Sequence, residues 1–259
     1  MKVVILAGGY GSRISEESYL KPKPMIEIGE QPILWHIMKE YSHYGFNEFI
    51  ICLGYKGYKI KEYFNDYYLH TSDVTFDLKN NKMITHDNHS ENWKVTLVDT
   101  GIGTLTAGRL KRIQKYIKDE PFMLTYGDGV SDINLNELLD FHKQNKKIAT
   151  LTSYNFGQRF GVVITNEKNE IVSFREKRTS DGSFINAGYM VFNPEIFDKL
   201  PDNSDEVMLE EVLENLADER ELVAYKHKGL WFCMDTQRDK RQLEEMWKNN
   251  DAKWKTWED

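Results

Sequence analysis

Hydrophobic residues in this chain come in short runs and in helical repeats that alternate along much of its length. The apolar runs at 3–6, 49–53 and 121–126 are typical of strands buried on both faces of a parallel sheet. Between the first two runs, apolar residues recur at helical spacing from Ile33 to Tyr41. A strand, a helix and a second strand with short links form the βαβ unit of a parallel sheet. We therefore predict an α/β fold, a Rossmann-like and mostly parallel sheet flanked by helices.

One stretch departs from this rhythm and predicts a projecting β-hairpin. Residues 74–78 alternate between apolar and polar side chains, Asn80 and Asn81 supply a turn, and a strand returns at 82–85. A second hairpin is predicted between 161 and 174. A projecting hairpin like the first typically makes a contact between subunits or acts as a lid. We expect a homo-oligomer.

The composition narrows the class of protein. The chain has 259 residues, 40% of them hydrophobic, which is enough for a packed core, and its apolar runs fall far short of the ~20 residues that span a bilayer. Met1 and Lys2 lead straight into a strand, so we expect a cytoplasmic protein without a membrane partner. The formal net charge of -7 argues against nucleic acid as a partner, because that binding needs many Lys and Arg.

The two cysteines offer little chemistry in the sequence. Cys52 and Cys233 both lie in apolar, strand-like runs, where a reduced and buried thiol is commoner than a disulfide. The chain has no cysteine pair with zinc-type spacing. We therefore predict that both thiols are inert.

A glycine-rich turn follows the first strand and predicts a phosphate-binding site. The turn is Ala7-Gly8-Gly9-Tyr10-Gly11-Ser12-Arg13. Its glycines let backbone amides converge on an anion, and Arg13 adds a permanent charge. Further on, Lys21-Pro22-Lys23-Pro24 presents two lysines on a stiff, non-helical segment. The turn is neither a dinucleotide fingerprint, because Ile14 stands where a third glycine is needed, nor a P-loop, because Gly-Ser-Arg replaces Gly-Lys-Ser/Thr.

These residues carry a resemblance to a known family. Leu6-Ala7-Gly8-Gly9-Tyr10-Gly11-Ser12-Arg13 with Pro22-Lys23-Pro24 resembles the signature of sugar-1-phosphate nucleotidylyltransferases, which usually have Gly-Thr-Arg in place of Gly-Ser-Arg. Further motifs resemble the glucose-1-phosphate cytidylyltransferase branch: Trp35-His36-Ile37-Met38, Gly54-Tyr55-Lys56-Gly57-Tyr58, Val98-Asp99-Thr100-Gly101, Tyr126-Gly127-Asp128-Gly129 and Met234-Asp235-Thr236. The resemblance covers nearly the whole chain and implies a nucleotidyltransferase (GT-A-like) fold with added β-hairpins.

The same resemblance implies how the chain is divided. No Pro/Ser-rich or charged linker interrupts it, so we expect one nucleotidyltransferase domain over 1–259. Within that domain, about 1–155 looks like the nucleotide-binding part. About 156–259 looks like the sugar-binding part with a C-terminal helix.

The reaction that the resemblance implies makes CDP-glucose and pyrophosphate from CTP and α-D-glucose 1-phosphate with Mg²⁺, in nucleotide-sugar and polysaccharide biosynthesis. An oxygen of the sugar phosphate attacks the α-phosphorus, so the protein mainly aligns two anions and stabilises charge, and no protein nucleophile is needed. Two like unit charges ~4 Å apart repel by about 1 kcal/mol in water and by several times that near a protein surface. Cations must therefore lie between the two substrates.

The expected catalytic set is Arg13, Lys23 and Asp128. Lys23 would bridge the α-phosphate and the sugar phosphate, and Arg13 would bind the β- and γ-phosphates. The competitor of Lys23 is Lys21, which precedes the Pro-Lys-Pro core, and we assign it to the surface. By resemblance, the nucleotide-binding residues are Leu6, Ala7, Gly8, Gly9, Gly11, Ser12, Arg13, Lys23, Thr100, Gly101, Thr104, Arg109 and Asp128. Thr100 and Gly101 belong to an Asp-Thr-Gly loop that looks like the cytidine type.

Asp128 and Asp235 are the candidate metal ligands. Each follows an apolar strand, and a small number of carboxylate oxygens suits Mg²⁺, which also binds triphosphate oxygens. The alternative for Asp235, which precedes Thr236, is that it caps the next helix. The resemblance implies that both aspartates bind the metal.

The sugar side is expected at Glu176 and Lys177. By resemblance, Lys177 would bind the sugar phosphate and Glu176 the ring hydroxyls, with Asn186 and Gly188 nearby. The alternative is a solvated surface pair. This chain also departs from the family here, because Glu-Lys-Arg stands in place of the usual Glu-Lys-Pro.

Two rival functions stay open. One is the same chemistry with another nucleoside triphosphate or another phosphorylated acceptor. The other is a catalytically silent, nucleotide-sugar-binding regulatory subunit. The joint presence of Arg13, Lys23, Asp128, Lys177 and Asp235 disfavours the silent subunit, because a pure binding protein could dispense with each of them.

Overall fold

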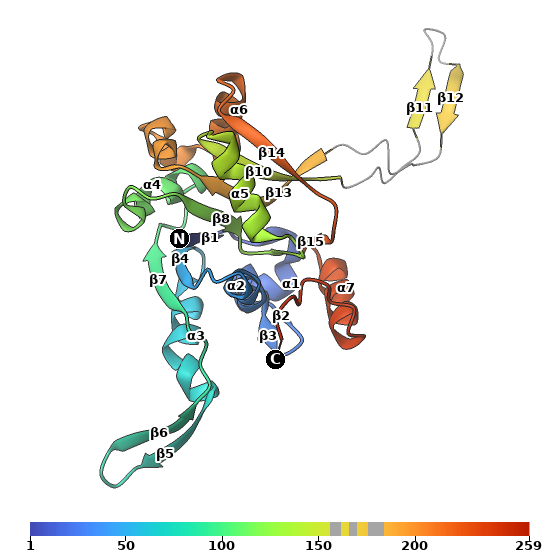
Figure 1. The fold of residues 1–259 in the computed structure, drawn as a ribbon. Coiled ribbons are helices and arrows are strands. Elements are labelled where there is room, and N and C mark those ends of the chain that lie inside the picture. Colours follow the sequence, from blue (N-terminus) through green and yellow to red (C-terminus); the bar gives the residue numbers. More distant parts are fainter. Residues whose placement is uncertain (156–161, 166–169, 176–183, 259) are drawn as a thin grey trace.

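The computed structural model describes residues 1–155, 162–165, 170–175 and 184–258, which build a seven-stranded sheet (Figure 1). In spatial order the strands are β14 (Leu222–His227), β10 (Ala149–Asn155), β13 (Phe184–Phe192), β8 (Phe122–Tyr126), β1 (Lys2–Ala7), β4 (Glu48–Leu53) and β7 (Lys94–Asp99). Of these seven strands, β13 alone runs antiparallel to its neighbours. The predicted α/β fold with a mostly parallel sheet is confirmed.

Helices cover both faces of this sheet, because alternate residues of its strands point to opposite sides. Val3 and Ile5 of β1 pack into one core cluster, and Val4 and Leu6 pack into the other. The helices on the first side are α2 (Ile33–His43), α3 (Gly57–His70), α5 (Leu135–Asn145) and α7 (Gln237–Lys248). Those on the second side are α4 (Thr106–Ile117) and α6 (Leu209–Asp218).

Several short elements complete the described chain. Short pairs of strands are β2 (Glu27–Ile28) with β3 (Gln31–Pro32), and β9 (Gly129–Ser131) with β15 (Trp231–Cys233). Short helices are η1 (Ser12–Ile14), α1 (Ser15–Ser18), η2 (Lys23–Met25), η4 (Pro194–Lys199) and η5 (Ser204–Glu206). The 3-10 turn η2 is a small correction, since we expected the Lys-Pro segment to be stiff and non-helical.

Both predicted hairpins are present. β5 (Ser72–Asp77) pairs with β6 (Lys82–Asn88), and together they project beyond α3 in Figure 1. β11 (Val162–Thr165) pairs with β12 (Ile171–Arg175), and this hairpin also stands away from the sheet.

Parallel pairing places four strand ends at one edge of the sheet. β1, β4, β7 and β8 all run in the same direction, so the loops after them meet there. The β9–β15 pair brings a distant part of the chain to the same edge, because Cys233 pairs with Gly129 and the Met234 amide donates to the Asp128 carbonyl at 2.9 Å. Asp128 and Asp235 consequently become neighbours.

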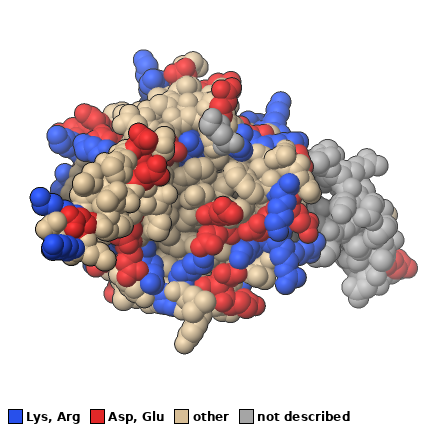
Figure 2. All heavy atoms as spheres, turned by 90° about the horizontal axis from the view of Figure 1, so that it is seen from below, with Lys and Arg blue, Asp and Glu red and all other residues tan. Residues whose placement is uncertain are grey.

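The composition led us to expect neither a membrane-spanning segment nor a basic surface for nucleic acid. Among the described residues, no helix has the length and apolar character to cross a membrane. Figure 2 shows acidic and basic side chains interspersed over one face. The coloured part of that face differs from the basic stripe typical of nucleic-acid-binding proteins.

Candidate active site

A cavity of about 310 Å³ opens at the edge where the parallel strands end. The turn after β1 and the loop between β7 and α4 wall it from two sides, as expected for loops that leave the same edge of the sheet. The described residues that line it are Leu6, Ala7, Gly8, Gly9, Tyr10, Gly11, Ser12, Arg13, Lys23, Pro24, Ile102, Gly103, Thr104, Leu105, Thr106, Arg109, Tyr126, Gly127, Asp128 and Met208.

Two glycines of the turn have a definite geometric task. Gly11 has φ +64°, in the left-handed region, and a Cβ there would lie 3.2 Å from the Lys23 Cβ. A Cβ on Gly8 would lie only 2.0 Å from the Arg109 Nη1 atom. The turn therefore needs glycine at both positions, one for backbone conformation and one for contact with Arg109.

Arg109 lies beneath the cavity and ties its loops together. Its side chain is almost fully buried, and Nη1 donates to the carbonyls of Leu53 at 3.0 Å and Gly101 at 2.9 Å. Nη2 donates to the Gly8 carbonyl at 3.0 Å. Burial lowers the pKa of Arg109 from its ordinary value. These bonds hold the turn after β1 against the loop after β7, and direct contact of Arg109 with a triphosphate stays a prediction.

The Asp-Thr-Gly loop divides its predicted residues between the cavity and the framework. Thr104 lines the cavity. The Thr100 hydroxyl is buried, donates to the Leu53 carbonyl at 2.7 Å and accepts from Arg109 Nη1 at 2.7 Å. The Gly101 amide donates to Asp99 Oδ1 at 3.0 Å, and its φ of +86° lies in the left-handed region. Thr100 and Gly101 thus shape the loop from behind the lining residues.

Lys23 lies between the two predicted metal ligands. Its Nζ atom is 2.6 Å from Asp128 Oδ2 and 2.7 Å from Asp235 Oδ1, although the chain separates the lysine from both aspartates by more than a hundred residues. Arg13 Nη1 contacts the second oxygen of Asp235 at 2.6 Å. Lys21 instead pairs with Glu27 at 2.7 Å, with 27% of its side chain exposed, and has no ion pair with either aspartate among the described residues.

Burial and charge act in opposite directions on Lys23. Only 9% of its side chain is exposed, and this burial disfavours the ammonium form, but the nearby carboxylates of Asp128 and Asp235 outweigh it and raise the pKa of Lys23. Arg13 is 71% exposed, so its contact with Asp235 is screened by solvent. Lys23 is therefore a buried cation held by two carboxylates, and Arg13 is an exposed one.

The helix-cap alternative for Asp235 does not hold. Thr236 is the N-cap of α7, where its Oγ1 atom accepts from the Asp239 amide at 3.3 Å. Asp239 Oδ2 in turn accepts from the Asp235 and Thr236 amides at 3.1 and 2.8 Å. This capping box leaves the Asp235 carboxylate directed at Lys23 and Arg13.

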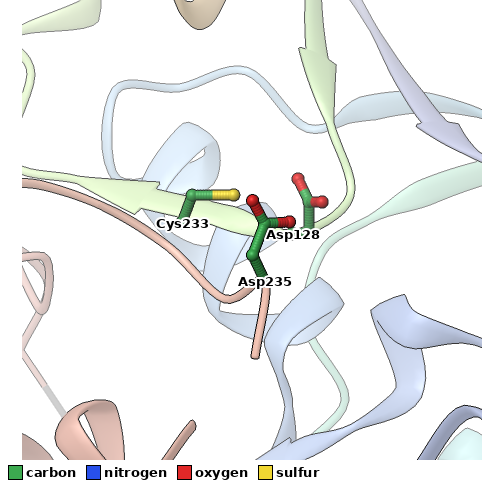
Figure 3. A group of neighbouring side chains, drawn as sticks. All are labelled: Asp128, Cys233 and Asp235. Atoms are coloured by element: carbon green, nitrogen blue, oxygen red, sulfur yellow. The ribbon is translucent and has the colours of Figure 1, made fainter. Parts of the chain in front are cut away.

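The donor set fits the expected Mg²⁺ ion. One oxygen of Asp128, one of Asp235 and the Cys233 sulfur all lie within 4.8 Å of one another, and Figure 3 shows their side chains converging. Mg²⁺ prefers hard oxygen ligands and keeps waters and phosphate oxygens in its shell, so the two carboxylates suffice for it. The position between them already holds the Lys23 ammonium, which shows that it accepts a cation.

Some cavity residues were missed by the sequence reasoning. Tyr126 ends β8 and lines the cavity, and its hydroxyl donates to Glu210 Oε1 at 2.6 Å. Burial, followed by the charge of Glu210, raises the pKa of Tyr126. Gly188 makes room for this ring, because a Cβ there would lie 2.7 Å from Tyr126 Cδ2. The sequence places Tyr126 only in a strand and a family motif, and nothing in its local pattern indicates its distant partner Glu210.

The predicted sugar-side residues are only partly placed. Glu176 and Lys177 lie outside the described residues. Asn186 is an exposed residue of β13, just before its buried part, and its Oδ1 atom accepts from the Gly188 amide at 2.9 Å. Gly188 thus lies against the cavity residue Tyr126, with Asn186 bonded to it, and contact of either residue with a sugar stays a prediction.

Comparison with known proteins supplies the family. The nucleotidyl transferase family model matches residues 2–259. Glucose-1-phosphate cytidylyltransferase of Salmonella typhi is 53% identical over 259 residues, covering 100% of both chains. A Bacillus subtilis protein named "Probable glucose-1-phosphate cytidylyltransferase" is 44% identical over 257 residues, covering 99% of this chain and 100% of that one. A solved UDP-glucose pyrophosphorylase complexed with UDP-glucose has the same fold, with TM-score 0.69, 18% identity and coverage of 96% and 98%.

Proposed function

Since this chain belongs to the nucleotidyl transferase family, and within it to the glucose-1-phosphate cytidylyltransferases, we propose that it transfers CMP from CTP to α-D-glucose 1-phosphate. The products are CDP-glucose and pyrophosphate. The observation that supports this best is the Lys23 ammonium, held 2.6 and 2.7 Å from two carboxylates at the wall of the cavity. Such a cluster concentrates cations where two phosphates must meet.

Each residue of the cluster has a distinct task in this reaction. The amides of the turn from Gly8 to Ser12 bind phosphate oxygens, and exposed Arg13 turns from Asp235 to the β- and γ-phosphates. Lys23 stabilises the charge that develops on the α-phosphate as the sugar phosphate oxygen attacks it. Rotation of the Lys23 side chain carries its ammonium from the carboxylates to the phosphate oxygens.

Asp128 and Asp235 are the residues that would hold Mg²⁺. When bound, this ion supplies positive charge for the triphosphate. The chain needs no nucleophile of its own, because the attacking atom belongs to the sugar phosphate. We assign the sugar side to Glu176, Lys177, Asn186 and Gly188, on the resemblance described above.

A panel of nucleoside triphosphates tests this proposal. Pyrophosphate release is measured with glucose 1-phosphate and Mg²⁺ in the presence of CTP, UTP, dTTP, ATP or GTP. We expect release with CTP, because a site built to hydrogen-bond cytosine leaves a polar group unpaired with another base, at a cost of about 1–3 kcal/mol. Release with another triphosphate favours the first rival. Silence with all five directs the search to another phosphorylated acceptor, and then to the binding subunit.

We further propose that the protein is a homo-oligomer assembled through the β5–β6 hairpin. Apolar side chains are exposed there, with Phe76 58%, Leu78 88% and Ile84 51% exposed. Exposed apolar groups on a projecting element are typical of a protein interface. A monomeric mass at micromolar concentration would contradict this proposal. The Phe76→Lys variant is expected to have a lower mass in solution than the wild-type oligomer.

A further inference from the structure

Cys233 lies beside the two aspartates rather than in an inert core. It ends β15 opposite Gly129 of β9. The same pairing brings Asp128 and Asp235 close to each other and to Cys233. The Cys233 thiol is free and half-buried, whereas Cys52 is fully buried in β4. In Figure 3 the sulfur points toward the Asp235 carboxylate, and the Asp128 carboxylate lies beside that of Asp235.

The three donor atoms have the chemistry of a site for a thiophilic ion. They all lie within 4.8 Å of one another. Bonds of about 2.3 Å from zinc to sulfur and about 2.0–2.2 Å from zinc to oxygen place tetrahedral ligands about 3.5 Å apart, so shifts of about 1 Å complete the set. Zn²⁺ takes thiolate and carboxylate ligands together, whereas Mg²⁺ leaves the sulfur unused.

Lys23 independently shows that a cation occupies this position. Lys23 as a whole residue is 7% exposed, and its ammonium contacts both aspartates. A metal ion on the same oxygens and the ammonium exclude each other, because both need the same lone pairs and repel at this distance. Lys23 and a bound metal ion therefore compete.

We propose that Asp128, Cys233 and Asp235 form a binding site for a thiophilic divalent cation, Zn²⁺ in the first place, which displaces Lys23, takes the two carboxylates from Mg²⁺ and thereby inhibits nucleotidyl transfer. The thiol proton passes to solvent as the sulfur–metal bond forms. The inhibition rests on the proposed function, but the metal binding does not. The chain's own sulfur thus makes one site serve two classes of ion, Mg²⁺ for turnover and Zn²⁺ for its arrest.

Cobalt titration of the metal-free full chain tests the site without turnover. Co²⁺ gives a thiolate-to-metal charge-transfer band in the near ultraviolet when a cysteine binds it. We expect this band to saturate at one Co²⁺ per chain in the wild type and in Cys52→Ala, and to be missing in Cys233→Ala. Added Zn²⁺ should abolish the band at one equivalent, whereas Mg²⁺ should need at least about a hundredfold excess.

Two further variants examine the competition with Lys23. Lys23→Met should bind Co²⁺ at least about tenfold more tightly, because the competing charge is gone. Asp235→Asn should weaken binding by a similar factor, and melting curves confirm that each variant is folded. A wild type without the band, a band that persists in Cys233→Ala, or unchanged affinity in Lys23→Met would overturn the proposal.

Inhibition is measured separately, so that its failure is distinguishable from failure of the proposed function. With Mg²⁺ in excess, Zn²⁺ should stop pyrophosphate release by the wild type, and Cys233→Ala should lose at least about tenfold of this sensitivity. If no triphosphate is turned over, the cobalt band still decides the metal site. Equal Zn²⁺ sensitivity in the wild type and Cys233→Ala would contradict the inhibitory role.

Discussion

Lys23 and Glu40 are both almost fully buried, at 7% and 0% exposure, yet their surroundings favour opposite charge states. At the carboxyl edge of the sheet, the carboxylates of Asp128 and Asp235 keep Lys23 charged. In the core under α2, burial raises the pKa of Glu40 well above its ordinary value, and the Tyr189 hydroxyl donates to its Oε2 atom at 2.9 Å. The protein retains charge where phosphates are to bind, and favours neutral polar groups where packing is the task.

His36 follows the same rule as Glu40. It lies in α2 among the rings of Trp35, Trp247, Trp254 and Trp257, with centroids 4.7 to 6.3 Å away. Burial lowers its pKa to about 4, so the ring is neutral at physiological pH and its Nε2–H donates to the Ile28 carbonyl at 2.8 Å. His36 is thus a packing residue of the core.

The largest expected effect on turnover comes from replacing the two carboxylates that keep Lys23 charged. Asp128→Asn and Asp235→Asn should each lower turnover about a hundredfold or more, because holding the metal charge is worth several kcal/mol in the transition state. Asp140→Asn, on the surface of α5, is the matched control, since its carboxylate pairs only with Lys143, at 3.5 Å, among the described ion pairs. If both active-site variants kept wild-type turnover at limiting Mg²⁺, the charged cluster would be structural, and the comparison with Glu40 would break.

Replacement of Lys23 comes next. Lys23→Met should lower kcat roughly a hundredfold, the typical loss for one preorganised donor to a developing charge. Lys21→Met is the control, because Lys21 pairs with Glu27 and should leave kcat within about twofold. A rise in KM for glucose 1-phosphate with kcat spared would show that Lys23 does not bridge the reacting phosphates.

The pH dependence of stability sharpens the neutral side of the comparison. His36 binds its proton with a pKa of about 4 in the folded chain, against an ordinary value of 6.5, so the unfolded chain takes up more protons between these values. The contribution of His36 to stability should fall as the pH drops from 6.5 to 4, by on the order of 3 kcal/mol. Denaturant unfolding at several pH values measures this, with His36→Gln removing the trend and His43→Gln retaining it.

The smallest expected effect concerns Glu40. Its pKa is raised in the folded chain, so its contribution to stability is present at low pH and is lost as the unfolded chain ionises above its ordinary pKa of 4.5. Glu40→Gln should therefore raise the free energy of unfolding at pH 8 by at least about 1 kcal/mol and change it less at pH 4. Parallel stability curves for the variant and the wild type from pH 4 to pH 8 would show that Glu40 is charged in the fold.

Local patterns sufficed for much of the fold. The apolar runs predicted β1, β4 and β8, and the helical spacing from Ile33 to Tyr41 predicted α2. The edge that holds the cavity followed from parallel strand ends. The antiparallel insertion of β13 between β8 and β10 was not predicted, because strand order depends on contacts between residues far apart in the chain.

The sequence predicted which residues belong to the site better than it predicted which side chains contact one another there. Lys23, Asp128 and Asp235 were chosen from separate motifs, and the structure brings them together. Arg109 was expected at the nucleotide, yet its long side chain bonds to the carbonyls of Gly8, Leu53 and Gly101, which only the fold brings together. Cys233 was expected to be inert, because its apolar run does not reveal which side chains lie opposite.

The most direct test of the central claim is phosphorus-31 NMR of the wild-type protein with CTP, glucose 1-phosphate and Mg²⁺. We predict that signals of a nucleoside diphosphate sugar and of free pyrophosphate grow in equal amounts, and only when glucose 1-phosphate is present. Loss of CTP without the sugar phosphate, or release of inorganic phosphate in place of pyrophosphate, would contradict nucleotidyl transfer at this cluster.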